Sequence, residues 1–271
     1  MRKIACSFFL VCAFAGAQWI NQPIAGAPRN ADGTVNLKGP LPPPLYGKPD
    51  LSGVWQAKGT PRAANGLFGL GESENSKYFR DVLSDFPPNE RPLTPEAVER
   101  ARRNQQADLG GNPSVNCLPD GTPHGDFLPE PFKVIQTPSE IVLLYEVETT
   151  FRQIFTDGRK QLVDPSPSWN GYSVGHWEGD TLVVDSIGFN DRSFLDARGT
   201  PHSSDMRVEE RFRRIDYGHL EVTVTITDPK TFTKPIKFTE VLEMLPDTDL
   251  FEHYCLENEK DGRAAKANAA K

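Results

Sequence analysis

A histidine and several short polar side chains gather in one stretch between two apolar runs, residues 188–214 (GFNDRSFLDARGTPHSSDMRVEERFRR). Histidine titrates near neutral pH, and a neighbouring carboxylate such as Asp196 could orient His202 as a general acid or base. The alternative is an ordinary polar connection, in which Asn190 and Asp191 make turn hydrogen bonds and His202 only ends the loop. No nucleophile motif or suitably spaced second histidine decides between these two interpretations.

Residues 207–214, at the end of this stretch, alternate between two sets of side chains at every second position, as in a β-strand. Charges of both signs on one face predict a solvated outer surface with cross-strand ion pairs. If Glu210 points inward instead, it needs a cationic partner, and Arg152 is the candidate. Such a pair could bind a polar group of a ligand, assist proton transfer, or serve only the fold. The two faces are Arg207, Glu209, Arg211 and Arg213, and Val208, Glu210, Phe212 and Arg214.

Aromatic residues are spaced around glycines in the segment WNGYSVGHW, residues 169–177. Gly171 and Gly175 would let a ligand or another backbone approach closely. These aromatics therefore predict either a pocket for an apolar or aromatic molecule or the plugged end of a barrel. The residues expected to line a ligand site are Arg152, Trp169, Tyr172, Trp177, Phe189, Asn190 and Phe194.

Several other kinds of site find no support in the sequence. The five histidines are dispersed, without an HxH or HExxH pattern, and there is no Gly-rich phosphate loop or paired Cys-x-x-Cys. We therefore expect no metal and no cofactor. A formal net charge of -7 and a pI near 5.3 argue against nucleic acid and anionic membranes as partners.

Residues 1–17 have the features of a cleaved secretory signal: two basic residues, an apolar run and the small-residue pattern Ala15-Gly16-Ala17. The run is shorter than the roughly 20 residues that span a bilayer, so we expect no membrane insertion. Cleavage would leave Cys117 and Cys255 in a periplasmic or extracellular protein, where one disulfide is the economical outcome. Two separate buried thiols, or a metal pair, are the alternatives.

The remaining sequence predicts an all-β domain over residues 50–258, after a Pro/Gly-rich extended lead-in over 18–49 and before a charged tail over 259–271. A first strand ends at Trp55, and an insertion over about 58–130 holds one peripheral helix, from Pro95 to Leu109. From Phe132 apolar residues recur at every second position, and about eight more strands follow as a mainly antiparallel meander. About nine strands are enough for a closed barrel or a strongly curved half-barrel.

Two parts of the chain resemble known proteins. The triplet Gly53-Val54-Trp55 at the head of the first strand looks like the opening of a lipocalin-type or calycin-like barrel. Residues 117–258, from CLPDGTP through SVGHWEGDTLVVDSIGFND to HYCLEN, resemble a widespread family of secreted bacterial proteins. The resemblance implies a secreted β-barrel and carries over no catalytic residues. The lipocalin comparison implies an interior cavity for a small, largely apolar molecule.

Three functional hypotheses follow from the sequence, and the first two are the main ones. The first is an exported barrel that binds a small apolar or aromatic compound, in an oligomeric state that the sequence does not specify. The second is a metal-independent hydratase, lyase, isomerase or hydrolase with His202, Asp196 and Glu210 as proton-transfer groups and Arg152 as an anion anchor. The third is a surface or assembly protein without a ligand. An enzyme needs acid/base groups that converge on a cavity, whereas a binding protein needs only shape and a few donors.

Overall fold

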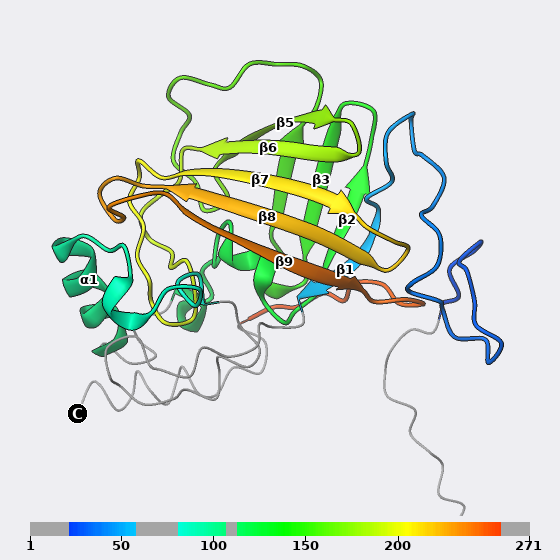
Figure 1. The fold of residues 1–271 in the computed structure, drawn as a ribbon, viewed down its shortest axis with the longest axis horizontal. Helices are drawn as coiled ribbons and strands as arrows, with labels where there is room; N and C mark the ends of the chain where they lie inside the picture. The colour runs from blue at the N-terminus through cyan, green and yellow to red at the C-terminus, as the bar shows by residue number, and fades with distance from the viewer. Residues whose placement is uncertain (1–21, 58–80, 107–112, 256–271) are drawn as a thin grey trace, which may run out of the picture.

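The computed structural model describes residues 22–57, 81–106 and 113–255, and in it nine strands form a closed barrel (Figure 1). Each strand pairs with its neighbours in chain order, and β1 pairs with β9, so the expected barrel is confirmed in its closed form. The strands are β1 (Gly53–Ala57), β2 (Phe132–Gln136), β3 (Glu140–Tyr145), β4 (Phe151–Phe155), β5 (Tyr172–Glu178), β6 (Thr181–Ile187), β7 (Arg207–Arg214), β8 (His219–Thr227) and β9 (Ile236–Met244).

One junction departs from the antiparallel meander, because β4 and β5 run parallel. The pair Asp157-Gly158, which is common in tight hairpin turns, lies just after β4. The chain instead continues through residues 156–171, which extend beyond the barrel wall before β5 begins (Figure 1). Parallel neighbours need such a crossover, since the chain must return to the end from which the first strand started.

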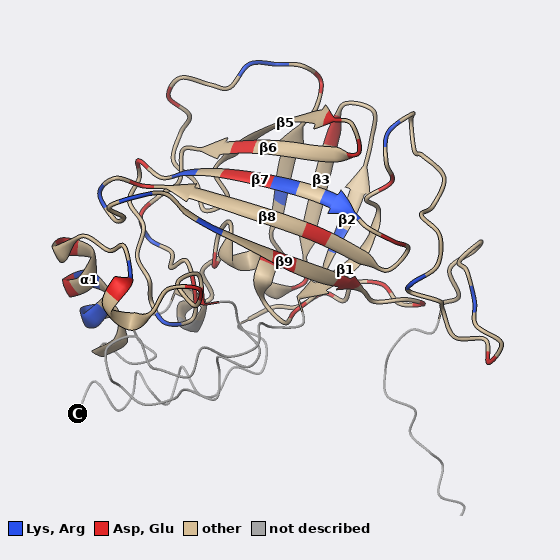
Figure 2. Cartoon of the chain, viewed as in Figure 1, with Lys and Arg blue, Asp and Glu red and all other residues tan. Residues whose placement is uncertain are grey.

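The antiparallel hairpins are joined by turns with residues typical of hairpins. Glu178 pairs with Thr181 around Gly179, whose φ of 62° is readily adopted by glycine. Arg214 pairs with Leu220 around the Asp216–Gly218 turn. Both signs of charge lie along β7 (Figure 2), where Arg213 pairs with Glu221 of the neighbouring β8 and Arg211 pairs with Glu178 at the end of β5. The expected solvated outer face is confirmed for β7.

The barrel interior is filled by apolar side chains over much of its length. The space among one set of them is about 10 Å³, roughly the room of one water molecule. Trp55 is fully buried beside this set, and the guanidinium of Arg214 lies 5.1 Å from its ring centroid. This region is therefore a packed core and not a ligand cavity. The set is Leu51, Val134, Ile141, Leu143, Ile154, Leu182, Phe212 and Leu220.

The helix α1 (Pro95–Gln106) lies outside the barrel (Figure 1), as its thin apolar stripe predicts. Thr94 Oγ1 accepts a hydrogen bond from the backbone N–H of Ala97 at 3.2 Å, an N-cap contact. Arg100 of the helix donates to the backbone carbonyls of Asp191 and His202, and so ties the helix to the loop before β7. Short 3-10 turns are η2 (Pro88–Glu90), η4 (Pro113–Asn116), η5 (His124–Phe127) and η6 (Val147–Thr149).

The expected disulfide is present and joins Cys117 to Cys255 across 138 positions of the sequence. The part of the lead-in from residue 22 onward contacts the barrel, where Arg29 pairs with Asp247 at 2.8 Å. The expected signal segment, the charged tail and the expected helix end at Leu109 lie outside the described residues. Within the described part of the chain, no helix has the length and apolarity needed to cross a bilayer.

Candidate functional site

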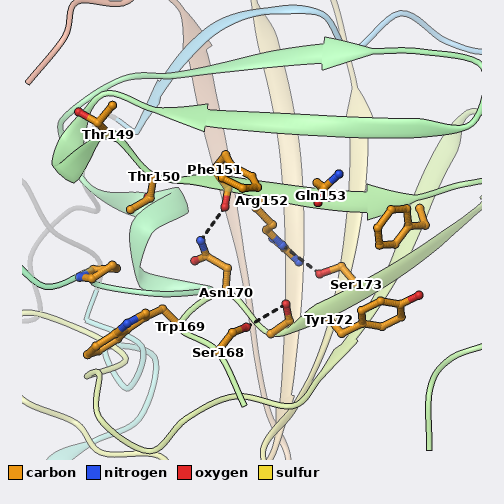
Figure 3. Close-up of a pocket in the computed structure, with 13 residues that line it drawn as sticks. Thr149, Thr150, Phe151, Arg152, Gln153, Ser168, Trp169, Asn170, Tyr172 and Ser173 are labelled. Atoms are coloured by element: carbon orange, nitrogen blue, oxygen red, sulfur yellow. Dashed lines mark hydrogen bonds between the residues drawn. The ribbon is translucent and has the colours of Figure 1, made fainter. Parts of the chain in front are cut away.

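A pocket of about 540 Å³ opens at the seam between β4 and β5 (Figure 3). It lies in the barrel wall, and its residues come from the start of β4, the end of the crossover and the start of β5. The residues that line it are Pro119, Thr149, Thr150, Phe151, Arg152, Gln153, Phe155, Ser168, Trp169, Asn170, Gly171, Tyr172 and Ser173.

The pocket exists because the parallel pairing is short. β4 and β5 pair only where Ile154–Phe155 lies opposite Ser173–Val174. Closer to the N-terminal ends of both strands, side chains bridge the gap instead. Asn170 Nδ2 donates to the carbonyl of Phe151 at 3.0 Å (Figure 3). The sheet is therefore open at this point, and the opening is the pocket.

Gly171 lets the crossover come down onto the barrel at the edge of this opening. Its φ is +64°, and a Cβ built there would lie 2.7 Å from the Phe189 ring and 2.8 Å from the carbonyl oxygen of Ile187. Both distances are too short for any side chain at this position. A glycine is thus required for residues 168–172 to lie against Phe189 and form the pocket wall.

The pocket walls are aromatic with a few polar groups between the rings. Phe151 is 60% exposed although it belongs to a strand, and Trp169, Phe155 and Tyr172 are half-buried. The rings of Phe155 and Tyr172 pack together, with centroids 5.4 Å apart. In Figure 3 Trp169 and Tyr172 lie toward opposite sides of the pocket. Ring surfaces with adjacent amides and hydroxyls suit a small molecule that has both an apolar plane and polar substituents.

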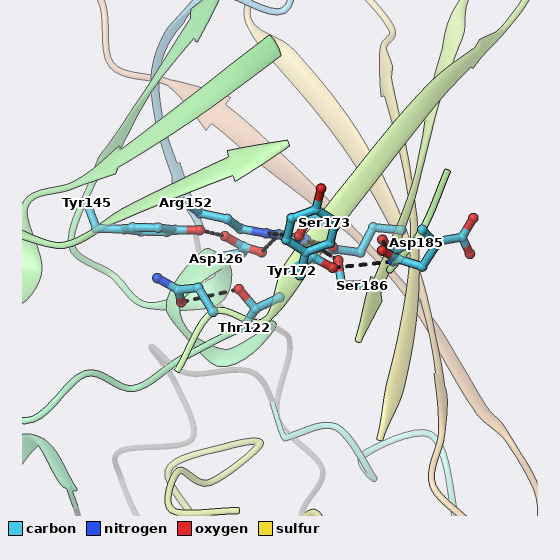
Figure 4. Close-up of polar contacts among 11 residues, drawn as sticks. Thr122, Asp126, Tyr145, Arg152, Tyr172, Ser173, Asp185 and Ser186 are labelled. Carbon is cyan, nitrogen blue, oxygen red and sulfur yellow. Dashed lines mark hydrogen bonds and ion pairs between the residues drawn. The ribbon is translucent and has the colours of Figure 1, made fainter. Parts of the chain in front are cut away.

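The floor of the pocket is a buried ion pair inside the barrel. Arg152 points inward from β4 and pairs with Glu210 of β7, and its Nη1 also contacts Asp126 of η5 at 3.1 Å. Arg152 Nε donates to Ser173 at 3.2 Å, and Nη2 donates to Ser186 at 2.9 Å (Figure 4). Serine is small, so these positions on β5 and β6 leave room for the guanidinium to reach β7.

Every N–H of Arg152 therefore has an acceptor within the protein. A guanidinium has five N–H donors, and the contacts to Ser173, Ser186, Asp126 and the two oxygens of Glu210 account for them. The side chain ties four strands together at the pocket floor. It provides a rigid polar floor, but it has no free donor with which to bind a ligand.

Asp126 carries a proton at neutral pH. Complete burial raises its pKa to about 8, the Arg152 guanidinium opposes this shift, and the nearby Glu210 adds to it. Tyr145 donates its hydroxyl to Asp126 Oδ1 at 2.5 Å (Figure 4), and burial together with this carboxyl raises the pKa of Tyr145. A protonated Asp126 leaves Arg152 paired with Glu210, so the group is nearly neutral, as a buried site requires.

His202 and Asp196 do not meet in the structure, and neither lines the pocket. His202 is 1% exposed, and its ring nitrogens contact Ser193 Oγ at 2.8 Å and the carbonyl of Ser203 at 3.1 Å. Burial lowers the pKa of His202. Asp196 is fully buried and accepts hydrogen bonds from its own loop, including the hydroxyl of Thr200 at 2.8 Å. Burial, reinforced by nearby Asp81, raises the pKa of Asp196 to about 6.

The structure brings only some of the other expected ligand residues together at the pocket. Arg152, Trp169 and Tyr172 line the pocket. Phe189 lies behind the wall, between Gly171 and the ring of His202. Asn190 holds the adjoining turn, where its side-chain oxygen accepts from the N–H of Arg192 at 3.1 Å. Trp177 and Phe194 are half-buried and do not line the pocket.

Sequence reasoning missed Phe151, Gln153 and Asn170. Alternation in FRQIF already places Phe151, Gln153 and Phe155 on the face opposite Arg152. An exposed aromatic there was a usable signal, because strand positions that face water seldom need a phenyl ring.

Within the described ranges, no cluster of three or more histidine, cysteine, aspartate or glutamate side chains could hold a metal ion. No protein-family model, curated protein or solved structure matches this chain. The functional assignment therefore depends on the geometry of the pocket.

Proposed function

We propose that this protein binds a small, ring-containing molecule in the pocket at the β4–β5 seam. The proposal is supported by one observation: aromatic rings are accessible in a concave site. The buried ion pair between Arg152 and Glu210 forms the floor of that site. A volume of about 540 Å³ lies within the range of known small-molecule sites. Phe151 and Trp169 supply ring surfaces, and Thr150, Gln153 and Asn170 supply hydrogen-bonding groups at the edges.

This site differs from the one that a lipocalin-like barrel implies. A lipocalin-like ligand would enter the barrel interior, whereas the apolar layer around Leu143 and Phe212 encloses only about 10 Å³. We propose a lipocalin-like barrel whose ligand binds in the wall. The Cys117–Cys255 disulfide and the signal-like N-terminal segment support a periplasmic or extracellular location.

The pocket favours binding over acid/base catalysis. Among the residues that the structure describes, those lining the pocket include no histidine, aspartate or glutamate that could move a proton near neutral pH. His202 and Asp196 are buried in hydrogen bonds of their own loop, and Glu210 is held by Arg152. The exposed rings in a concave site also support a binding protein over a purely structural surface protein, which needs no such rings.

The test is a titration of the full chain with small aromatic compounds, followed by NMR or calorimetry. Trp169→Ala and Phe151→Ala should each weaken binding by about tenfold or more, as expected for aromatic residues that carry binding energy. Val241→Ala removes a similarly exposed apolar side chain from β9, away from the pocket, and should bind as the natural protein does. An unaffected Trp169→Ala variant would exclude the pocket as the site.

A further inference from the structure

We infer that the ligand is an aromatic or otherwise planar anion, of the aryl carboxylate type, and that Arg192 recognises its charge. This inference rests on the proposed function and adds the chemical class of the ligand. It is drawn from the distribution of charge around the pocket and from the stacking of arginine on the pocket rings.

The first observation is the absence of acidic groups from the described part of the pocket lining. The chain carries 37 acidic residues and a net charge of -7. None of the lining residues that the structure describes is acidic, and one of them, Arg152, is basic. A site without carboxylates on an acidic protein avoids the repulsion that an anionic ligand would meet elsewhere on the surface.

The second observation is a pair of arginines stacked on rings that line the pocket. The guanidinium carbon of Arg192 lies 4.9 Å from the Trp169 ring centroid, and that of Arg159 lies 3.7 Å from the Phe155 centroid. Stacking orients a guanidinium and leaves its N–H edge available to an acceptor. Neither arginine is among the lining residues, but each contacts a ring that is.

The two arginines differ in whether they are already neutralised. Asp157 neutralises Arg159, with Nη2 to Oδ2 at 2.6 Å and a second contact through Nε. Arg192 is exposed, and no carboxylate in the described part of the chain forms an ion pair with its guanidinium, its sequence neighbour Asp191 included. The Arg192 fork is therefore the group at this site that is able to take up an external anion.

A planar carboxylate suits this arrangement better than a compact anion. The fork of Arg192 matches the two oxygens of a carboxylate, and a ring attached to that carboxylate can lie against Trp169 or Phe151. Arg152 has no free donor, so it contributes to the floor and not to the recognition of charge. The preference for an anionic ligand consequently depends on Arg192.

The experiment compares two probes with the same ring system, 2-naphthoate and 2-naphthamide, by calorimetric titration of the full chain at low salt. We expect the natural protein to bind the carboxylate about two- to fivefold more tightly, the range of one exposed ion pair. Arg192→Gln should abolish most of that preference, read as the ratio of the two affinities measured in the same variant. Arg207→Gln removes an exposed arginine of β7 at the same cost in net charge and should keep the preference.

Salt gives an independent readout, because an exposed ion pair is screened. The preference for the carboxylate should shrink as salt is raised, while binding of the amide stays constant. Equal binding of both probes, tighter binding of the amide, or a preference that survives Arg192→Gln would overturn this inference while the proposed function stands. Binding of neither probe, nor of the other aromatic compounds, would overturn both.

Discussion

Ionisation of the Asp126 carboxyl opposes folding. In the native state it is fully buried beside Glu210 and Tyr145, and its pKa is raised to about 8. An unfolded chain releases the same proton near pH 3.9. Folding therefore favours the protonated form throughout the interval between these two pH values.

The resulting prediction concerns stability against pH. The contribution of Asp126 is fully present below its unfolded pKa, falls as pH rises, and is lost above about pH 8. Asp126→Asn keeps a neutral side chain at every pH. The free energy of unfolding of the natural protein, measured relative to this variant by urea titration from pH 5 to 8, should fall by up to about 1.4 kcal/mol per pH unit.

Glu209→Gln is the matched control, since Glu209 is exposed and lies next to Glu210 on β7. It should retain the pH dependence of the natural protein. A pH profile for Asp126→Asn that is parallel to the natural one would show that Asp126 is already ionised in the folded state.

At the scale of the elements, the parallel contact of β4 with β5 determines where the pocket forms. The two strands pair over a short register, and the crossover then lies against the barrel at Gly171. Position 171 combines two requirements that only glycine meets: a positive φ, and no room for a Cβ beside Phe189.

Gly171→Ala should therefore lower the free energy of unfolding by more than the strained backbone conformation alone would. Gly158→Ala is the control, because Gly158 has a φ of +83° and nothing within 4 Å of a built Cβ. We expect Gly158→Ala to lower the free energy of unfolding by about 1–2 kcal/mol, the usual penalty of the left-handed region. Gly171→Ala should lose about 1–3 kcal/mol more from steric overlap and should also weaken ligand binding. Equal losses for the two variants, by urea unfolding, would contradict the close packing at Gly171.

At the scale of the whole molecule, the disulfide joins the segment before the barrel's second strand to the end of the described chain. Cys117 and Cys255 are 138 positions apart, so their bond restricts the unfolded chain strongly. Replacing both by alanine should lower the free energy of unfolding by about 2–5 kcal/mol, measured with denaturant.

A thiol count provides the companion measurement. Under denaturing but non-reducing conditions the protein, once residues 1–17 have been removed, should show no titratable thiol. Two free thiols in that preparation would contradict the bridge.

Much of the architecture follows from local sequence patterns. Alternation at period two located the eight strands from Phe132 onward and correctly placed Glu210 and Phe212 on one face of β7 and Arg211 and Arg213 on the other. The predicted helix start at Pro95 is correct, and Thr94 caps the helix just before it. These features depend on residues one to four positions apart, and short-range sterics and hydrogen bonding decide them.

The site was less accessible to such reasoning. The sequence indicated Arg152 as a partner for an inward Glu210, and it selected Trp169 and Tyr172, but it could not show that β4 and β5 pair in parallel. It also suggested that His202 and Asp196 act together, whereas the loop buries each in separate hydrogen bonds.

The sequence by itself thus determined the strands, their inward and outward faces, the helix start and the two cysteines available for a bridge. Only the tertiary structure decided that residues 58 positions apart, Arg152 and Glu210, meet inside the barrel and that a pocket opens in its wall. The physical reason is the range of the interactions. Side-chain alternation is a property of each strand, whereas the meeting of Arg152 with Glu210 and the gap beside Asn170 depend on how all nine strands close around a common core.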